Sequence, residues 1–360
     1  MQAAGCDVMM LSLGADLPWV SGYEAMPLER LTMLVVGATE EQGAVLFVPE
    51  LEAPRVVPQP GVFSVRPWAE HEGPVALVAE LAARLVPASG GTPRVAVSDR
   101  AWSTFLLALQ RLLPGWEWTV SSEVCAPLRA VKDEAEVDAL ARASAAADRV
   151  ARALLGGEIS LVGRPERDVS AEIAARLLEE GHQRVNFAIV GSGPNSASPH
   201  HEAGDRVIRA GEPVVCDFGG TLDGYCSDIT RTVFTGEPEA ELRRIYEVVA
   251  EAQRAGVEAA RVGSPCQEVD RAARRVIDSA GFGRYFVHRT GHGIGLEEHE
   301  DPYMVEGNSA PLVPGNAFSV EPGIYVPGRY GVRIEDLVVA TAAGPRPLNV
   351  ADHSLVVLGP

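Results

Sequence analysis

The feature that most constrains the fold is a set of carboxylates placed within strand-like apolar runs. Residues 213–236, PVVCDFGGTLDGYCSDITRTVFTG, carry Asp217 directly after the run PVVC and Asp228 directly before ITRTVF. Carboxylates are almost never fully buried without a partner, because an isolated one is neutralised in a low-dielectric interior. The sequence therefore requires a fold that supplies a compensating positive charge to these strands.

The same pattern recurs further along the chain. Glu321 ends FSVE, Glu335 ends VRIE, and His292 lies between glycines in TGHGIG. Any one of these acids could be a strand-end residue facing water, but four of them with one glycine-flanked histidine are hard to place independently on a surface. Four carboxylates that meet in an interior repel one another strongly. Divalent cations would remove that repulsion, and five ligands fit a pair of them.

The ligand types also favour particular metals. Oxygen-rich ligation with one imidazole suits Mn²⁺ and also accepts Co²⁺ or Zn²⁺. We therefore expect two divalent metal ions, with Mn²⁺ preferred.

Up to residue 125, strand-like runs alternate with helical stretches, which predicts a small α/β domain. The expected strands are 7–13, 31–37, 44–48, 94–98 and 116–120. The expected helices are 75–86 and 102–113. No phosphate-binding glycine motif or catalytic cluster occurs in this part of the sequence, so its chemistry cannot be read.

From residue 126 to 360, runs of strands and runs of helices are separated. This pattern predicts an α+β domain with helices on one face of a curved antiparallel sheet. The expected helices are 132–155, 168–181, 238–262 and 266–280, and the expected strand regions are 185–191, 206–235 and 285–340. Asp168 is expected to be an N-cap, and Asp223, in LDGY, a turn residue.

Charge and cysteine content narrow the choice of partner and compartment. A net charge of −18 argues against nucleic acids and anionic membranes as partners. No apolar run approaches 18 residues, so no transmembrane helix is expected. The five cysteines are scattered without a CxxC, and the start MQAAGCDVMML makes a poor signal peptide. We expect reduced thiols and a cytoplasmic location.

Five segments, in a fixed order, carry a resemblance to a known family. They are IVGSGPNSASPHH, GEPVVCDFGGTLDGYCSDITRTVFTG, HRTGHGIGLEEHE, SVEPGIY and GVRIEDLVV. Residues 180–340 thereby resemble the pita-bread metallopeptidases, in particular the Xaa-Pro aminopeptidases (aminopeptidase P) and Xaa-Pro dipeptidases (prolidases). The first domain resembles the creatinase/prolidase-type N-terminal domain of that branch. The resemblance implies small peptide substrates with proline as second residue, and a homo-oligomer, either dimer or tetramer.

The resemblance also implies a role for each metal ligand. Asp217 would bind one metal through two oxygens, His292 and Glu321 would bind the other, and Asp228 and Glu335 would bridge the pair. All five residues are present. Their presence disfavours two alternatives with the same fold, a non-catalytic binding protein and a metal-free amidinohydrolase of the creatinase kind.

Catalytic roles follow from the same resemblance and from the needs of peptide hydrolysis. Glu321 would move protons between water and the leaving nitrogen. His200 and His299 would hold the substrate and stabilise the tetrahedral intermediate. His201 and His288 are expected to contact substrate or support the residues that do.

Two further residues are expected to orient the ligands. Arg333, two residues before Glu335, could bind a ligand carboxylate such as Asp217. Thr230, two residues after Asp228, could donate a hydrogen bond to another.

The sequence leaves open whether the chain is an Xaa-Pro aminopeptidase or an Xaa-Pro dipeptidase. A prolidase restricted to dipeptides needs a cation for the free carboxylate of its substrate, which an arginine suits. Some relatives carry an arginine where HEDPY places Tyr303, and its absence tilts the prediction toward aminopeptidase P. Arg289 or Arg329 could supply that cation instead, so prolidase remains the alternative.

Overall fold

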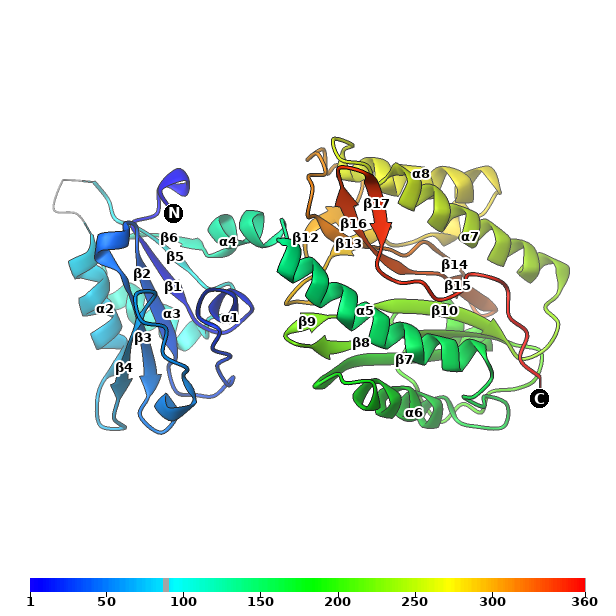
Figure 1. Cartoon of the computed structure of the whole chain (residues 1–360), viewed down its shortest axis with the longest axis horizontal. Helices are drawn as coiled ribbons and strands as arrows, with labels where there is room; N and C mark the ends of the chain where they lie inside the picture. The colour runs from blue at the N-terminus through cyan, green and yellow to red at the C-terminus, as the bar shows by residue number, and fades with distance from the viewer. Residues whose placement is uncertain (87–90, 360) are drawn as a thin grey trace. The chain divides into compact units, whose positions relative to one another are not determined.

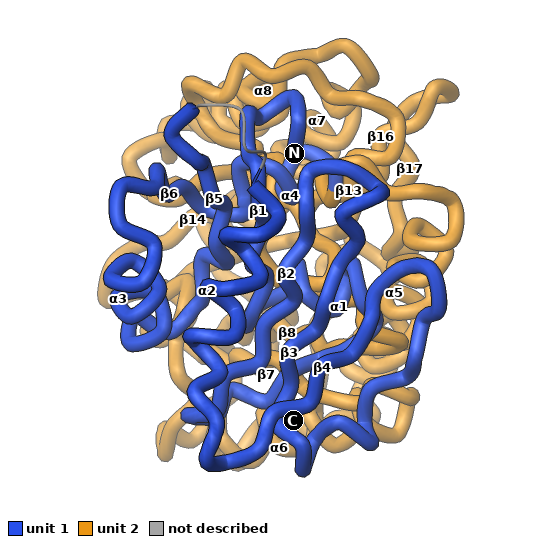
Figure 2. The backbone as a smooth tube through the Cα atoms, turned by 90° about the vertical axis from the view of Figure 1, so that its left-hand side faces the viewer, with its two compact units in different colours: residues 1–128 blue, residues 129–360 orange. Residues whose placement is uncertain are grey.

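The structure, a computed structural model, describes residues 1–86 and 91–359. The chain divides into two compact units, Met1–Leu128 and Arg129–Pro360, drawn in two colours in Figure 2. We call them unit 1 and unit 2. The α+β class predicted from the sequence is confirmed. In the described part of the chain, no helix combines the length and the apolarity that crossing a membrane requires.

Unit 1 is a mixed six-stranded sheet with helices packed on it. Its strands, in the order β4-β3-β2-β1-β5-β6, are Ser64–Trp68, Ala44–Pro49, Met33–Gly37, Val8–Leu11, Arg94–Val97 and Glu117–Val120. Strand β1 pairs antiparallel with β2 and parallel with β5. The helices are α1 (Asp16–Ser21), α2 (Pro74–Leu85), α3 (Ser103–Leu112) and α4 (Ser122–Arg129), the last of which ends at the start of unit 2.

The apolar runs of unit 1 form strands because both faces of its sheet are covered. Along β1, Val8 and Met10 belong to one hydrophobic cluster, whereas Met9 and Leu11 belong to another. Successive side chains of a strand point to opposite faces. A strand buried on both faces is therefore apolar throughout and not alternating.

Unit 2 is built from antiparallel strands in two groups. The first group has the order β10-β8-β7, with β9 paired to β8, and comprises β7 (Arg184–Ser192), β8 (Pro213–Leu222), β9 (Tyr225–Cys226) and β10 (Ile229–Phe234). The second has the order β12-β11-β13-β16-β17, with residues Glu300–Met304, Gly291–Gly293, Ala317–Val320, Asp336–Thr341 and Gly344–Pro347. Strands β14 (Gly323–Val326) and β15 (Tyr330–Arg333) form a separate pair. A bridge between Thr230 and Glu335 joins the two groups.

Four helices of unit 2 are divided between these strand groups (Figure 1). Helices α5 (Glu134–Leu155) and α6 (Glu166–Glu179) pack on the first group. Helices α7 (Ala240–Ala259) and α8 (Cys266–Ser279) pack beside β14 and β15, and α8 also packs on the second group. The strand groups thus turn one face to helices and leave the other for polar side chains.

Strand β8 shows how this division places an acid. Val214, Cys216 and Phe218 lie in the hydrophobic cluster formed with α5 and α6. Asp217 lies between them in the sequence and so points to the opposite face of the sheet. Its neighbour across the ladder, Ile189 on β7, lines the same internal cavity of unit 2 as Asp217 does.

One sequence prediction about a helix start is wrong. Helix α6 begins at Glu166, with Pro165 as N-cap in an extended conformation, so Asp168 lies inside the first turn. Proline lacks an N–H and its fixed φ suits a helix start. The Glu166 carboxylate faces inward and accepts a hydrogen bond from the Ser192 backbone at 2.7 Å.

Candidate metal centre

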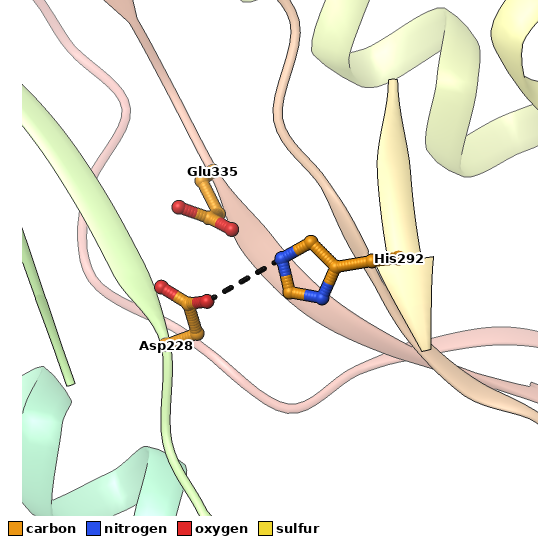
Figure 3. A group of neighbouring side chains, drawn as sticks. All are labelled: Asp228, His292 and Glu335. Carbon is orange, nitrogen blue, oxygen red and sulfur yellow. Dashed lines mark ion pairs between the residues drawn. The ribbon is translucent and has the colours of Figure 1, made fainter. Parts of the chain in front are cut away.

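Three residues from separate elements meet in the interior of unit 2. Asp228 precedes β10, His292 is in β11, and Glu335 lies between β15 and β16. One ligand atom from each lies within 4.8 Å of the others, and all three residues are buried. Figure 3 shows the side chains pointing toward a common centre, with a dashed line joining Asp228 and His292.

The other two predicted ligands border the same space. Glu321 Oε1 lies 3.4 Å from His292 Nε2. Asp217 and Glu321 line a cavity of about 510 Å³ together with Asp228, His292 and Glu335. The structure therefore brings all five predicted ligands to one cavity.

Glycine next to His292 allows this close approach. A Cβ atom at Gly291 would overlap the carbonyl oxygen of Ser319 on the neighbouring strand β13. Glycine lets the two backbones come together where no side chain fits. His292 then donates a hydrogen bond to β13, from its backbone N–H to Ser319 Oγ at 3.1 Å.

The protonation of His292 leaves a lone pair aimed at acids. Its Nδ1 lies 3.1 Å from the Gly293 carbonyl oxygen, which can only accept, so Nδ1 carries the proton. Nε2 then presents its lone pair to Glu321 and to Asp228, whose Oδ2 is 3.6 Å away. Burial, with His299 nearby, lowers the pKa of His292 to about 3, so the ring is neutral.

The charge of the carboxylates is only partly compensated, by Arg333, which pairs with Asp217 at 2.6 Å. Burial, and then the neighbouring acids, raise the pKa values of Asp228 and Glu335 well above their usual range. Burial raises the pKa of Glu321 to about 7, although Arg333 opposes the shift. Among the described residues, Asp217 Oδ1 and Glu335 Oε1 are buried oxygens without a hydrogen-bond partner. An oxygen-rich set with one neutral imidazole and spare lone pairs fits divalent cations.

Arg333 organises one side of the cavity. Its Nη2 donates to Asp217 Oδ2 at 2.6 Å and to the Pro199 carbonyl at 3.3 Å. Its Nη1 donates to Tyr325 Oη at 2.8 Å, and its Nε donates to Thr230 Oγ1 at 3.1 Å. The contact with Asp217 is the one expected from the sequence.

Thr230 and His288 extend this hydrogen-bond network. Thr230 Oγ1 donates to Glu335 Oε2 at 2.7 Å, so it connects Arg333 to a second predicted ligand. His288 Nε2 lies 2.9 Å from Tyr325 Oη, and its Nδ1 lies 2.7 Å from the Arg289 carbonyl. The carbonyl can only accept, so Nδ1 donates and Nε2 accepts from the tyrosine. Burial lowers the pKa of His288 to about 4.

The two histidines predicted to hold substrate lie at the cavity wall. His200 and His299 are both among its lining residues and both are exposed. The His299 ring centroid is 4.0 Å from that of His292. Although part of the residue reaches solvent, partial desolvation of its ring at the cavity wall lowers the pKa of His299. His201 differs, because its Nε2 bonds to Glu166 Oε2 at 2.8 Å. It anchors the segment that carries His200.

Three residues that hold the site residues in place by hydrogen bonds were not predicted from the sequence. Ser319 Oγ donates to Glu321 Oε1 at 3.1 Å, and its position two residues before Glu321 could have revealed it. Tyr325 connects Arg333 with His288 but carries no local signal beyond its place in SVEPGIY. Glu166 accepts hydrogen bonds from Ser192 and Asn195 as well as His201. It is remote in sequence from all of them.

The two arginines considered as carboxylate-binding residues have different surroundings. Arg289 lines the cavity. Arg329 bonds to Glu241 Oε2 at 2.9 Å, with about half of each side chain exposed. It is not among the residues lining the cavity.

Comparison with known families and proteins agrees with this geometry. Residues 138–342 match the model of metallopeptidase family M24, and residues 1–131 match the creatinase/prolidase N-terminal domain. The chain is 44% identical to "probable dipeptidase PepE" of Mycobacterium tuberculosis over 360 residues, covering 99% of this chain and 93% of that protein. It is 34% identical to the Xaa-Pro dipeptidase of Lactobacillus delbrueckii subsp. lactis, covering 99% of this chain and 96% of that protein.

A solved structure is similar over the whole chain. The crystal structure of dipeptidase PepE from Mycobacterium ulcerans has 42% sequence identity and a TM-score of 0.89. The match covers 100% of this chain and 95% of that one.

Proposed function

Because the chain belongs to metallopeptidase family M24, we propose that it hydrolyses the Xaa-Pro bond at the N-terminus of small peptides, using two divalent metal ions. One observation carries the proposal: Asp228, His292 and Glu335 meet within 4.8 Å in a buried, uncompensated cluster. Such a cluster has no structural benefit without a cation. The similarity to proteins named dipeptidase and Xaa-Pro dipeptidase supports the substrate class.

The predicted ligands would hold the metals. Asp217, Asp228, His292, Glu321 and Glu335 offer carboxylate oxygens and one imidazole nitrogen, a set that suits Mn²⁺ first and also Co²⁺ or Zn²⁺. The chemistry that such cations supply when bound is the activation of water as a nucleophile near neutral pH.

The protein's own side chains would manage the protons. Proline's nitrogen must be protonated before it leaves, so the reaction needs both a base and an acid. Glu321 is suited to both tasks, because its Oε1 borders the cavity beside His292. It would accept a proton from the attacking water and deliver it to the departing nitrogen. Ser319 Oγ holds the carboxylate in place by donating a hydrogen bond to Glu321 Oε1 at 3.1 Å.

Charge on the substrate carbonyl would be stabilised at the cavity wall. His200 and His299 line the cavity on segments separated by about a hundred residues, so they approach a substrate from different elements. Each ring can donate one hydrogen bond to an oxygen on which negative charge develops. Arg333 would act through Asp217 and Pro199, to which it donates, and so orient groups without touching the reacting bond.

Two activities fit this site, and different observations favour each. Tyr303, an uncharged residue in the segment that follows His299, favours an aminopeptidase P that accepts longer peptides. Arg289, which lines the cavity, favours a prolidase that requires a free carboxylate on proline. The sequence alone tilted the prediction toward aminopeptidase P, but we prefer the second activity, because the relatives reported above are named dipeptidase and Xaa-Pro dipeptidase.

The cellular setting follows from two properties of the chain. The five cysteines are free and buried, which supports a reducing compartment, and we propose the cytoplasm. A net charge of −18 supports small peptides over nucleic acids as partners.

The test compares the wild-type protein with Asp228→Asn, using Asp223→Asn as the matched control. Asp223 lies in the exposed turn between β8 and β9 at φ 51°, which asparagine adopts readily. After exhaustive chelation and titration with Mn²⁺, the wild type and Asp223→Asn should bind two Mn²⁺ by calorimetry and cleave Ala-Pro. Asp228→Asn should lose roughly 1,000-fold or more in kcat/KM, because a bound metal contributes several kcal/mol to the transition state.

The outcomes separate the parts of the proposal. Cleavage of Ala-Pro that survives complete metal removal would reject the mechanism. Equal Mn²⁺ binding by Asp228→Asn and wild type would remove Asp228 from the ligand set. Failure of the metal-loaded wild type to cleave any Xaa-Pro peptide would leave a binding protein.

A further inference from the structure

Helix α8 carries a buried ion pair that faces the segment before His292. Arg274 donates two hydrogen bonds to the Asp270 carboxylate, from Nε to Oδ2 at 3.0 Å and from Nη2 to Oδ1 at 3.0 Å. An arginine that binds a carboxylate through two donors fixes its orientation as well as its charge. Neither residue is among the described residues that line the cavity, so any influence of the pair on the site must pass through other residues.

The Asp270 carboxylate also binds Thr290, which lies two residues before His292. The N–H and the Oγ1 of Thr290 both donate to Asp270 Oδ1, each at 2.9 Å. Thr290 is fully buried and Asp270 is 1% exposed, so water cannot readily replace either partner. Three donors, two of them from Thr290, therefore meet on one carboxylate oxygen, and loss of that oxygen would leave buried donors without it.

Arg274 holds the residues that precede Thr290. Its Nη1 donates to the Phe286 carbonyl at 3.0 Å, and its Nη2 donates to the His288 carbonyl at 2.9 Å. Its Cζ also lies 4.2 Å from the centroid of the Phe286 ring, a cation–π contact. The segment 286–290 is thus fixed to α8 at three of its five residues.

From Thr290 the hydrogen bonds lead to two predicted metal ligands. The Thr290 carbonyl accepts from the backbone N–H of Glu321 at 2.8 Å. Ser319 closes the connection, because its Oγ accepts from the His292 N–H at 3.1 Å and donates to Glu321 Oε1 at 3.1 Å. The two side chains then lie 3.4 Å apart, from His292 Nε2 to Glu321 Oε1. Their relative position therefore depends on Thr290 and Ser319.

The other predicted ligands are supported from different elements. Arg333, at the end of β15, donates to Asp217 Oδ2 at 2.6 Å. Thr230, in β10, donates to Glu335 Oε2 at 2.7 Å. The support that begins at α8 therefore reaches one part of the candidate centre, whereas β10 and β15 support the rest. A partner that orients a ligand influences the metal that the ligand binds.

From these contacts, and resting on the proposed function, we propose that Asp270 is a positioning residue for one of the two metal sites. Through Thr290 it fixes His292 and Glu321, the two residues predicted to bind the same metal. Arg274 orients the Asp270 carboxylate for this task. The affinity for that metal then depends on a helix outside the cavity, while the affinity for the metal bound by Asp217 does not.

The test is a calorimetric titration of the chelated protein with Mn²⁺, which gives a binding constant for each site. Asp270→Asn is compared with the wild type. A second variant, Thr290→Val, removes one hydroxyl and keeps the backbone contacts, and Thr290→Ser restores the hydroxyl. The matched control is Asp148→Asn in α5. Asp148 is a buried helix aspartate that accepts backbone N–H donors, from Val350 at 2.7 Å and Ala351 at 3.3 Å.

We expect one binding constant to change and the other to stay. Asp270→Asn should weaken one Mn²⁺ site by roughly 10- to 100-fold and leave the second equal to that of the wild type. Thr290→Val should weaken the same site by a smaller factor, and Thr290→Ser should recover the wild-type constant. Asp148→Asn should lose stability in chemical denaturation, as Asp270→Asn does, but keep both constants. Electron paramagnetic resonance, which distinguishes a Mn²⁺ pair from a single ion, should show single ions in Asp270→Asn where the wild type shows pairs.

The opposing outcomes are separable. Equal weakening of both sites in Asp270→Asn, or the same weakening in Asp148→Asn, would mean that general stability controls metal binding, and the inference fails. Two unchanged constants in Asp270→Asn would also overturn it, while the two-metal site stands. If Asp270→Asn does not fold, unchanged constants in Thr290→Val overturn the inference. A wild type that binds fewer than two Mn²⁺ would reject the proposed two-metal function itself, and the inference with it.

Discussion

Units 1 and 2 bury very different side chains. Among the described residues of unit 1, Glu52 is the one buried charged side chain, and it accepts a hydrogen bond from Tyr23 Oη at 3.1 Å. The buried charged side chains of unit 2 include Arg129, Lys132, Asp148, Glu166, Asp217, Asp228, Arg231, Asp270, Glu300, Arg333, Glu335 and Asp336. An apolar core determines the fold of unit 1, whereas unit 2 also contains charges that its fold must accommodate.

The buried charges of unit 2 are themselves of two kinds. Some are compensated within the protein, such as Glu300, which pairs with Lys132 at 2.7 Å and with Arg129. Others, such as Asp228 and Glu335, face further acids and a neutral imidazole. The adjacent residues Glu335 and Asp336 belong to different kinds, because successive residues point to opposite faces. Compensated charges indicate structure, and uncompensated ones indicate a ligand.

The largest effect on stability is expected where a compensated pair is broken. Arg231 is fully buried and bonds to Asp336 Oδ1 at 2.8 Å, to the Glu335 carbonyl at 2.7 Å and to the Asp352 carbonyl at 3.0 Å. Arg231→Met leaves the Asp336 charge buried with fewer partners. We expect unit 2 to lose about 3–5 kcal/mol of unfolding free energy. This loss is measured by hydrogen exchange of peptides from both units as denaturant is added.

The control is Arg142→Met, which removes an exposed arginine 3.3 Å from Asp223, with more than half of each side chain exposed. Exposed pairs contribute at most about 1 kcal/mol. Exchange in unit 1 should be the same in all three proteins. A loss below about 1 kcal/mol in Arg231→Met would contradict the distinction between the two kinds of buried charge.

The sequence predicted most of unit 1, and the parts it missed have physical causes. The strands expected at 31–37 and 44–48 are confirmed as β2 and β3, because apolar runs bounded by turn residues are a local signal. Strand β4 was not predicted, since it contains Pro67, which argues against a strand. The structure tolerates this proline because β4 is at the edge of the sheet. Strand order involves distant pairings that no local pattern records.

For the candidate site, the acids could be found in the sequence but their partners could not. Asp217 and Glu321 follow apolar runs, a pattern visible in one segment. Tyr325 and Glu166 act through hydrogen bonds to residues far along the chain, such as His288 and His201. Those contacts depend on how strands align in space. The assignment of the four acids and one histidine to metals stays a prediction.

The second expected effect is a pH dependence of the stability of the metal-free protein, which comes from the acids of the cavity. Burial raises the pKa of Glu321 from a usual 4.5 to about 7, so the folded state holds a proton that the unfolded state releases. The protonated Glu321 adds about 3 kcal/mol to the free energy of unfolding below about pH 4.5. This addition is lost as the pH rises through about 7. Asp228 and Glu335 shift in the same direction.

Metal binding should cancel that loss, because a cation replaces the proton. The stabilisation gained on adding Mn²⁺ to the chelated protein should therefore be larger at pH 7.5 than at pH 5.5. Thermal unfolding at both pH values measures the gain, and Glu321→Gln should reduce its pH dependence. A gain that is equal at both pH values, or larger at pH 5.5, would contradict the account of uncompensated acids.

The smallest expected effect comes from one hydroxyl, and strand β10 provides its matched control. Thr230 Oγ1 donates to Glu335 Oε2 at 2.7 Å and accepts from Arg333 Nε at 3.1 Å. Thr232 Oγ1, two residues along the same strand, donates to the Arg333 carbonyl at 2.8 Å and accepts from its N–H at 3.2 Å. Both threonines are fully buried. Replacement by valine removes two hydrogen bonds in each case, so the two variants should lose similar unfolding free energy, about 1–3 kcal/mol.

Metal affinity should distinguish them. Only Thr230 bonds to a predicted ligand, and loss of such a partner typically lowers metal affinity by roughly 10- to 100-fold. Calorimetric titration with Mn²⁺ should therefore show weaker binding in Thr230→Val and unchanged binding in Thr232→Val. Equal weakening in both would mean that the strand's general stability controls the metal site. Weakening in Thr230→Val alone would show that the Thr230 hydroxyl orients the Glu335 carboxylate for metal binding. The acids that face the cavity would then depend on hydrogen bonds from the buried residues around them.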